Sequence, residues 1–166
     1  MTGPDCILLP VRLLRPTEET VPARVREVVA MILAEQAWTQ PICVEGTVHA
    51  LLDGHHRLAA ARDLGLAQVP VHVFDYAEVD LLSWRPEIAP TRAEVLARAV
   101  SGALYPHKTT RHIFPPRPVR PVPLASLAVT SSRRDLHPRN LHPQERAHAG
   151  RTTRKSPAAV KRQSPS

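Results

Sequence analysis

Apolar residues recur along the chain with the period of a helix in three places. Over residues 22–36, valine, isoleucine and leucine recur at three- and four-residue spacing behind Pro22, which predicts an amphipathic helix. A second helix is predicted over residues 55–64, ending before Gly65. A third is predicted over residues 91–101, where Thr91 and Glu94 have the spacing of a capping box.

Short apolar runs between these helices predict strands. The run over residues 6–14 contains Pro10 and therefore suits the edge of a sheet. Two runs, 41–45 and 48–52, flank Gly46 and indicate a hairpin or two adjacent strands, and valines alternate with other residues over 69–76. The pattern as a whole predicts an α+β fold with a small mixed sheet and about three helices.

Charge divides the 166 residues into two regions. Residues 1–116 carry 11 Lys or Arg and 13 acids, whereas residues 117–166 carry 11 and 2, so the net charge of +7 is −2 plus +9. The second region is rich in Pro, Ser and Arg and has no hydrophobic period. We therefore expect a folded domain over residues 1–127 and a basic, disordered tail over residues 128–166. The tail's charge predicts weak, salt-sensitive and nonspecific contact with nucleic acid.

The two cysteines, Cys6 and Cys43, lie in apolar runs without the spacing of metal or redox motifs, so both are predicted to be small core residues. The chain starts without a basic segment followed by an apolar one, and no run reaches the roughly 18 apolar residues of a membrane span. We expect a cytoplasmic protein with no membrane partner.

The segment DGHHR, residues 53–57, stands between a predicted strand and a predicted helix. The start of a helix offers unpaired backbone N–H groups, Gly54 allows an anion to approach closely, and Arg57 adds a bidentate donor. Asp53 is suited to hold a divalent metal or to orient a hydroxyl. This combination predicts a site for nucleotide phosphates. The alternative is that Asp53 only caps the helix. Adjacent histidines without further ligands at metal spacing predict no metal site of their own.

A second polar cluster, KTTRH over residues 108–112, precedes the apolar pair Ile113-Phe114. Two cations and two hydroxyls in five residues are suited to grip a phosphate from the side opposite a helix start. Alone, such a cluster is more often an exposed basic turn. Its significance comes from its combination with the DGHHR turn.

Four motifs together resemble those of the ParB/sulfiredoxin-like superfamily, in which a GxxR turn at a helix start binds nucleotide phosphates. The closest resemblance is to its free L-serine kinases. The motifs are the stretch 16–19 with Pro22 and Arg24 downstream, the DGHHR turn, Ser83-Trp84, and the KTTRH cluster. They occur in the family's order and cover roughly residues 6–127. His107 is a departure, because the family often has proline there.

The resemblance implies transfer of a phosphoryl group from ADP or ATP, with Mg²⁺, to the hydroxyl of free L-serine or a similar small hydroxy amino acid. It makes Glu18 the general base, with Glu19 as the alternative. It also implies that Asp53 holds the serine or the metal-nucleotide and that Trp84 walls the amino-acid pocket. The phosphate-binding residues that it implies are Gly54, His55, His56, Arg57, Lys108, Thr109, Thr110, Arg111 and His112.

Other readings of these residues stay open. Glu18 alone would be an exposed acid before a helix, and Trp84 alone a core residue. A sulfiredoxin-type reductase needs a reactive cysteine in the turn, where this chain has His55 and His56. A ParB-type DNA-binding protein needs a helix-turn-helix, which residues 117–166 do not predict. A regulator that binds nucleotide without turnover would show the same motifs as an active kinase.

Overall fold

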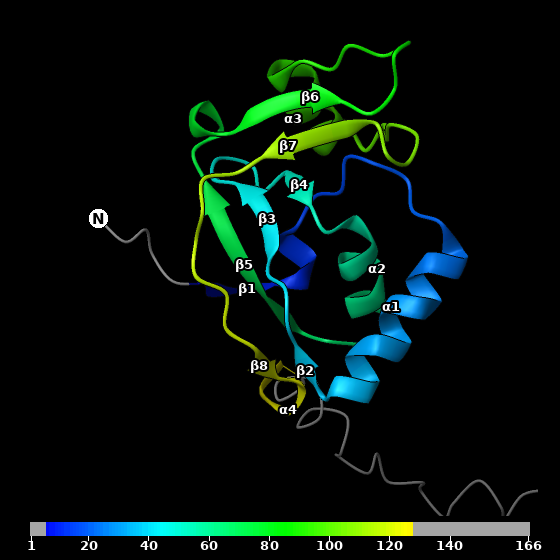
Figure 1. Cartoon of the computed structure of the whole chain (residues 1–166), viewed down its shortest axis with the longest axis vertical. Helices are drawn as coiled ribbons and strands as arrows, with labels where there is room; N and C mark the ends of the chain where they lie inside the picture. Colours follow the sequence, from blue (N-terminus) through cyan, green and yellow to red (C-terminus); the bar gives the residue numbers. More distant parts are fainter. Residues whose placement is uncertain (1–5, 128–166) are drawn as a thin grey trace, which may run out of the picture. The chain divides into compact units, whose positions relative to one another are not determined.

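A four-stranded mixed sheet lies at the centre of the computed structural model, which describes residues 6–127 (Figure 1). Its strand order is β1-β5-β3-β4. The strands are β1 (Ile7–Pro10), β5 (Gln68–Phe74), β3 (Ile42–Glu45) and β4 (Leu51–Asp53). The β3–β5 pair is parallel, and the other two pairs are antiparallel. The predicted α+β class with a small mixed sheet is confirmed.

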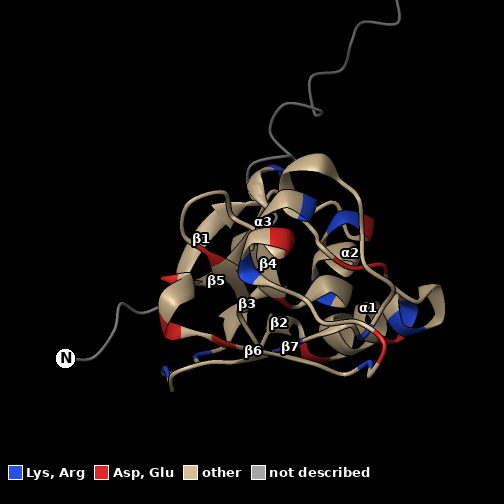
Figure 2. Cartoon of the chain, turned by 90° about the horizontal axis from the view of Figure 1, so that it is seen from above, with Lys and Arg blue, Asp and Glu red and all other residues tan. Residues whose placement is uncertain are grey.

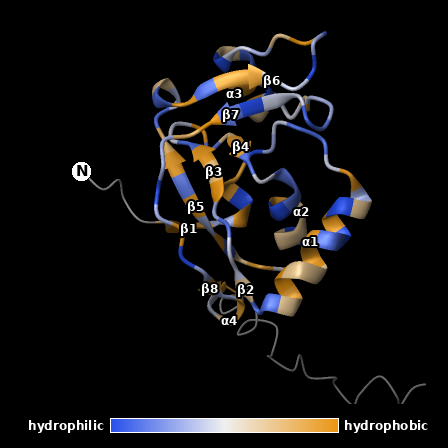
Figure 3. Cartoon of the chain, in the orientation of Figure 1, coloured by the Kyte–Doolittle hydropathy of each residue, from blue (hydrophilic) through white to orange (hydrophobic). Residues whose placement is uncertain are grey.

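The sheet follows the predicted apolar runs. Val69 and Val71 of β5 are fully buried, and the strand is flanked by partners on both sides. Figure 3 shows the ends of β3 and β5 near β4 as hydrophobic. The first run is an edge strand, as predicted, but it ends at Pro10 and continues as a 3-10 turn over Val11–Leu13. The early end places the next irregular segment, which contains Glu18, beside β4.

Two helices pack on each other beside the sheet, α1 (Pro22–Glu35) and α2 (His55–Asp63) (Figure 1). Both match the predicted segments to within one residue. Helix α1 begins with Pro22 in its first turn and ends where Gln36 takes a left-handed conformation with φ +49°. Gly65, beyond α2, also has a positive φ of +67°, as expected for a residue that ends a helix. These helices share the larger hydrophobic core with the sheet.

A second layer stands at the β4 end of the sheet (Figure 1). It contains the antiparallel ribbon of β6 (Asp80–Ser83) and β7 (Thr110–Ile113), together with α3 (Arg92–Ser101). Thr91 caps α3 by accepting the Glu94 amide hydrogen, as predicted. This layer has its own core cluster, which includes Phe74, Val95 and Tyr105.

Several short elements besides β6 and β7 were also not predicted from the sequence. Strands β2 (Ala37–Trp38) and β8 (Val122–Pro123) form a two-residue antiparallel pair, and α4 (Leu124–Leu127) follows. A 3-10 turn over Tyr76–Glu78 joins β5 to β6. These elements are too short to produce a hydrophobic period.

The cysteines, the tail and the absence of a membrane span were also the subject of sequence predictions. Cys6 and Cys43 are each partly exposed, so the prediction that both are core residues holds only in part. Cys43 packs against the second hydrophobic cluster, whereas Cys6 precedes the edge strand β1 and belongs to neither cluster. The expected tail, 128–166, lies outside the described residues. Within residues 6–127, no helix is both long and apolar enough to cross a membrane.

Acidic and basic residues are mixed over the same elements of the domain (Figure 2). Helix α1 carries both signs on its exposed side, where Arg24 pairs with Glu27 at 2.7 Å. This mixed surface agrees with the near-neutral charge expected of residues 1–116. The candidate site therefore has to be located by its geometry, since no single-sign region marks it.

Candidate functional site

A cleft of about 470 Å³ opens between α1, the start of α2 and the segment before β7. Its size is that of an ordinary small-ligand site. It brings together most of the residues singled out from the sequence: Glu18, Glu19, Asp53, Gly54, His55, His56, Arg57, Trp84, Lys108 and Thr110. Motifs that are far apart in the chain therefore meet in one place.

The DGHHR turn forms the start of α2 and one wall of the cleft. Gly54 is the N-cap residue, with φ +101°, a conformation that favours glycine. A methyl group there would lie 3.1 Å from Cγ1 of Ile42 and 3.3 Å from the Arg57 guanidinium carbon. Asp53 does not cap the helix, since no side chain caps α2. The capping alternative for Asp53 is therefore wrong, and the first amides of α2 remain unbonded by a side chain.

Arg57 is placed differently from the sequence expectation. Its Nη1 donates to the carbonyl oxygens of Gln40 (2.7 Å) and Pro41 (2.6 Å), and its Nη2 pairs with Oδ2 of Asp53 at 3.0 Å. The guanidinium thus ties the turn to the segment before β3. Because the Arg57 side chain lies across Gly54, its guanidinium donates to acceptors within the protein. It is therefore not the free bidentate donor for a phosphate that the sequence had suggested.

Both histidines of the turn bond to the segment that carries Glu18. Nε2 of His55 accepts the Thr17 amide hydrogen at 3.1 Å, and Nε2 of His56 accepts the Val21 amide hydrogen at 3.0 Å. Burial lowers the pKa of His55 to about 3, with the charges of His112, His56 and Arg57 acting in the same direction. Burial also lowers the pKa of His56. Both rings are therefore neutral at pH 7.

Glu18 is a buried carboxylate at the edge of the cleft, only 8% exposed. Its Oε1 accepts two hydrogen bonds from Thr110, one from the backbone N–H at 2.6 Å and one from the hydroxyl. The backbone on both sides is also held, because Tyr105 N donates to Thr17 O and Glu19 N donates to Tyr105 O, each at 2.8 Å. The alternative in which Glu18 is an exposed acid is wrong, because the backbone at Glu18 pairs with the backbone at Tyr105.

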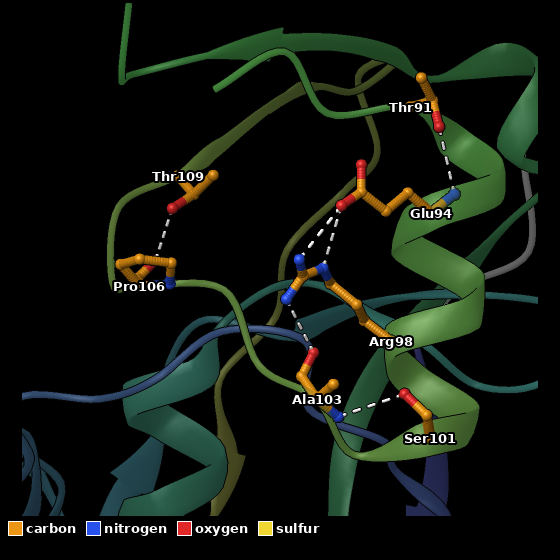
Figure 4. A network of polar contacts seen from close by, with 7 residues as sticks. All are labelled: Thr91, Glu94, Arg98, Ser101, Ala103, Pro106 and Thr109. Carbon is orange, nitrogen blue, oxygen red and sulfur yellow. Dashed lines mark hydrogen bonds and ion pairs between the residues drawn. The ribbon is translucent and has the colours of Figure 1, made fainter. Parts of the chain in front are cut away.

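A polar network on α3 holds the segment that follows this helix and contains Tyr105 (Figure 4). The Arg98 guanidinium bonds to Glu94 Oε1 through two nitrogens, at 3.1 and 3.2 Å, and to the carbonyl oxygen of Ala103 at 3.1 Å. The same guanidinium lies 3.9 Å from the centre of the Tyr105 ring. Helix α3 thereby sets the position of Tyr105, which in turn fixes the backbone around Glu18.

The KTTRH cluster is not a single phosphate clamp. Lys108 and Thr110 line the cleft, but Thr109 is buried and its hydroxyl donates to the carbonyl oxygen of Pro106. His112 contacts the Tyr76 hydroxyl at 2.8 Å, and burial lowers its pKa to about 4. Five successive residues cannot all face one cleft, since side chains alternate along a strand. Thr109, Arg111 and His112 therefore do not line this cleft, and nucleotide binding by the five residues stays a prediction.

The third residue outside the cleft, Arg111, stacks on Trp84 with its guanidinium carbon 4.5 Å from the ring centre. Trp84 follows β6, and its amide donates to Thr109 O at 3.0 Å. Its side chain is 57% exposed and lines the cleft, so the core interpretation of Trp84 is wrong. A large aromatic face at the mouth of the cleft is available to a ligand.

Sequence reasoning missed the apolar end of the cleft. Val28, Met31 and Ile32 of α1 line it together with Trp38 of β2. The Nε1 of Trp38 is buried and has no hydrogen-bond partner among the described residues. The helical period of α1 predicted a buried face, but it could not show that part of this face borders a cleft. Trp38 gave no signal, because its two-residue strand is too short to recognise.

Cys43 does not supply the reactive thiol that a reductase would need. Burial, followed by the nearby charge of Asp53, raises the pKa of Cys43 to about 12. A thiol with this pKa remains protonated at pH 7 and is a poor nucleophile. The geometry thus disfavours the sulfiredoxin-type reading.

The fold and the cleft define a class, since the chain has the fold of the free serine kinases. A solved variant of free serine kinase in complex with ADP superimposes with a TM-score of 0.68 at 16% identity, over 76% of this chain and 95% of that one. Free serine kinase in complex with AMP gives 0.68 at 16%, over 74% and 93%. C-terminally truncated SbnI from Staphylococcus aureus gives 0.68 at 17%, over 76% and 90%.

Sequence comparison narrows the class. The chain is 38% identical over 104 residues to an ATP-dependent L-serine kinase of Desulfurococcus mucosus, covering 59% of this chain and 41% of the relative. It is 36% identical over 88 residues to the enzyme of that name from Staphylothermus marinus, covering 49% and 35%. A ParB-like protein of Sulfolobus acidocaldarius is 34% identical over 79 residues, covering 46% and 39%. No family model matches the chain.

These matches confirm the resemblance to the ParB/sulfiredoxin-like proteins and to the free L-serine kinases among them. The chain spans about 35% to 41% of the length of these curated relatives.

Proposed function

We propose that this protein is a phosphotransferase that moves a phosphoryl group from ATP or ADP to the hydroxyl of free L-serine, giving O-phospho-L-serine. The observation that carries the proposal is the placement of Glu18, a buried and fully anchored carboxylate, in the same cleft as the start of α2. The names of the sequence relatives and the nucleotides in the structural neighbours agree with it. A donor of the ATP type is favoured by the relatives' names.

The start of α2 would bind the donor phosphates through its unbonded backbone amides. Lys108, which is exposed at the cleft, would neutralise part of their charge. His55, His56, Arg57 and Thr110 would shape this site, since their own polar groups are bonded within the protein. Thr109, Arg111 and His112 would support this site through their contacts within the protein, without touching the phosphates.

Glu18 would act as the general base. Both hydrogen bonds from Thr110 reach Oε1, so Oε2 is the oxygen that would take the proton from the serine hydroxyl. The serine would lie between Glu18 and Trp84, whose exposed ring walls that end of the cleft. The nucleobase would occupy the apolar end of the cleft, which Val28, Met31 and Ile32 line.

Asp53 fits a role in holding Mg²⁺. Its carboxylate is 60% exposed at the cleft, and Mg²⁺ in kinases is commonly held by one or two carboxylates together with substrate phosphates. Within residues 6–127, no group of three or more His, Cys, Asp or Glu side chains forms a metal site of its own. The ion would therefore enter with the nucleotide and supply charge neutralisation at the transferred phosphoryl group.

The decisive experiment incubates the purified full-length chain with L-serine, Mg²⁺ and either ATP or ADP, and measures phosphoserine. We expect product with at least one donor. Glu18→Gln keeps an oxygen for Thr110 but removes the base, so turnover should fall by about 10²- to 10⁴-fold at near-normal nucleotide affinity. Glu19→Gln is the matched control and should retain most turnover. No product with either donor, or an unimpaired Glu18→Gln, would remove the proposal.

A regulator that binds nucleotide without turnover is the second candidate, supported by the ParB-like relative. It predicts nucleotide binding in a calorimeter and no phosphoserine with either donor. The expected contact of the tail with nucleic acid lies outside the described residues and gains no support from the comparisons. A cytoplasmic location likewise remains part of the proposal.

A further inference from the structure

The five-residue segment Thr17–Val21 carries Glu18 without being part of a helix or a strand of the sheet. Such a segment normally depends on water or on neighbouring backbone for its amide hydrogen bonds. Here two of its amides, those of Thr17 and Val21, instead donate to imidazole rings. The acceptors are His55 and His56, 38 and 35 residues further along the chain.

These two bonds specify the state of each ring. An amide N–H can only donate, so Nε2 of each histidine must present a lone pair and the ring proton must stand on Nδ1. Only a neutral imidazole satisfies this requirement. The surroundings agree for His55, which faces His112, His56 and Arg57 and has no acidic group among its charged neighbours.

His56 has a more mixed environment. Three groups oppose its protonation by charge, namely Arg24, His107 and Lys108, and Glu18 favours it. Burial lowers the pKa of His56 in the same direction as these three groups, so the ring keeps its neutral form. The acceptor for Val21 is therefore preserved although a carboxylate lies nearby.

We propose that His55 and His56 are positioning residues that join the phosphate-binding turn to the base-carrying segment as one rigid unit. Both histidines belong to the first turn of α2, whose residues line the same cleft as Glu18. The two imidazoles thereby help to set the distance between the donor phosphates and the base, together with the contacts of Thr110 and Tyr105 to the same segment. The inference rests on the proposed function, because it assigns these contacts a role in placing Glu18 for catalysis.

The test compares substitutions that keep or remove the acceptor. In His55→Gln and His56→Gln, the side-chain oxygen can take the place of Nε2, whereas leucine has a similar volume and no acceptor. Amide hydrogen exchange is measured by NMR on the full-length chain, and kcat and KM are measured with ATP or ADP. His107→Leu is the matched control, since it removes a neighbouring imidazole that accepts neither amide hydrogen.

We expect His55→Leu to speed exchange at Thr17, and His56→Leu at Val21, each by at least about tenfold, because hydrogen-bonded amides exchange through local opening. Turnover should fall by about 10- to 100-fold with little change in the KM for nucleotide, since about 1 Å of misplacement of a reacting group is enough for such a loss. Each glutamine variant should have an amide exchange rate and a turnover close to those of the wild type. His107→Leu should leave both amides unchanged.

Wild-type exchange rates in the leucine variants would overturn the proposal, as would equal losses in the glutamine and leucine variants. If a leucine variant fails to fold, the wild-type protein decides: ¹⁵N spectra at pH 7 must show both Nε2 atoms unprotonated, and a protonated Nε2 refutes the assignment. A wild-type chain that makes no phosphoserine would refute the proposed function, while the exchange data would still test the two contacts.

Discussion

Mild acid should destabilise this domain, and His55 should be a main cause. Burial lowers its pKa on folding from the ordinary 6.5 to about 3. The unfolded chain therefore takes up a proton first as the pH falls, so the stability is complete above pH 6.5 and is lost progressively towards pH 3. From pH 7 to pH 5 the loss from this one ring is about 2 kcal/mol, and it approaches about 4 to 5 kcal/mol below pH 3.

Between pH 7 and pH 5, the change in stability comes from the buried histidines rather than from Glu45. Burial raises the pKa of Glu45, but hydrogen bonds from Thr47 and Val48 outweigh it and lower the pKa below 4.5, so Glu45 loses its contribution only in stronger acid. His112 acts in the same window, because burial lowers its pKa to about 4. By the same linkage, His112 causes a further loss of about 2 kcal/mol in the free energy of unfolding between pH 7 and pH 5.

The assay is urea denaturation at pH 7, 6 and 5, followed by tryptophan fluorescence. The free energy of unfolding of the wild-type chain should fall by about 3 to 4 kcal/mol across this range. His55→Gln cannot titrate, so its fall should be smaller by about 2 kcal/mol. Identical pH slopes for His55→Gln and wild type would refute the neutral, buried imidazole on which the reasoning depends.

Three further predictions concern single side chains. Gly54→Ala should destabilise the domain by about 1 to 3 kcal/mol in the same urea assay, because φ +101° is strained for alanine and its methyl group would crowd Ile42. Cys43 should react with iodoacetamide at pH 7 at least tenfold more slowly than in urea-unfolded chain, because burial raises its pKa to about 12. Arg98→Lys should lower turnover more than nucleotide binding, because lysine cannot keep both the bidentate bond and the stacking on Tyr105.

The helices around the cleft could be predicted because they have a clear period or a clear terminator. Helix α1 shows its hydrophobic spacing, α2 follows the Asp53-Gly54 turn, and Thr91 marks the start of α3. The pair β2 and β8 lies beyond such reasoning, since two residues cannot show a period and their partners are 84 to 86 residues apart. Long-range pairing of this kind depends on the whole fold.

Part of the candidate site was predictable as a set of residues, but its contacts were not. The sequence marked Glu18, Asp53 and Trp84, and the cleft contains all three. It could not show that the donors of Arg57 are directed at Gln40, Pro41 and Asp53. Whether a polar side chain faces a ligand or its own protein is decided by distances across the fold, about which local spacing carries no information.

The contacts of Glu18 would allow an irregular segment to carry the base that we propose. A carboxylate on a mobile loop would sample many positions, and only a small fraction would suit proton transfer. Here the segment is held by Tyr105 on its backbone, by Thr110 on its carboxylate, and by two histidines at its ends. These anchors come from two distant parts of the chain, residues 55–56 and 105–110, so the geometry at Glu18 depends on both at once. The substitution that removes one histidine acceptor should therefore impair turnover before it impairs nucleotide binding, although it removes no group that would touch the phosphates.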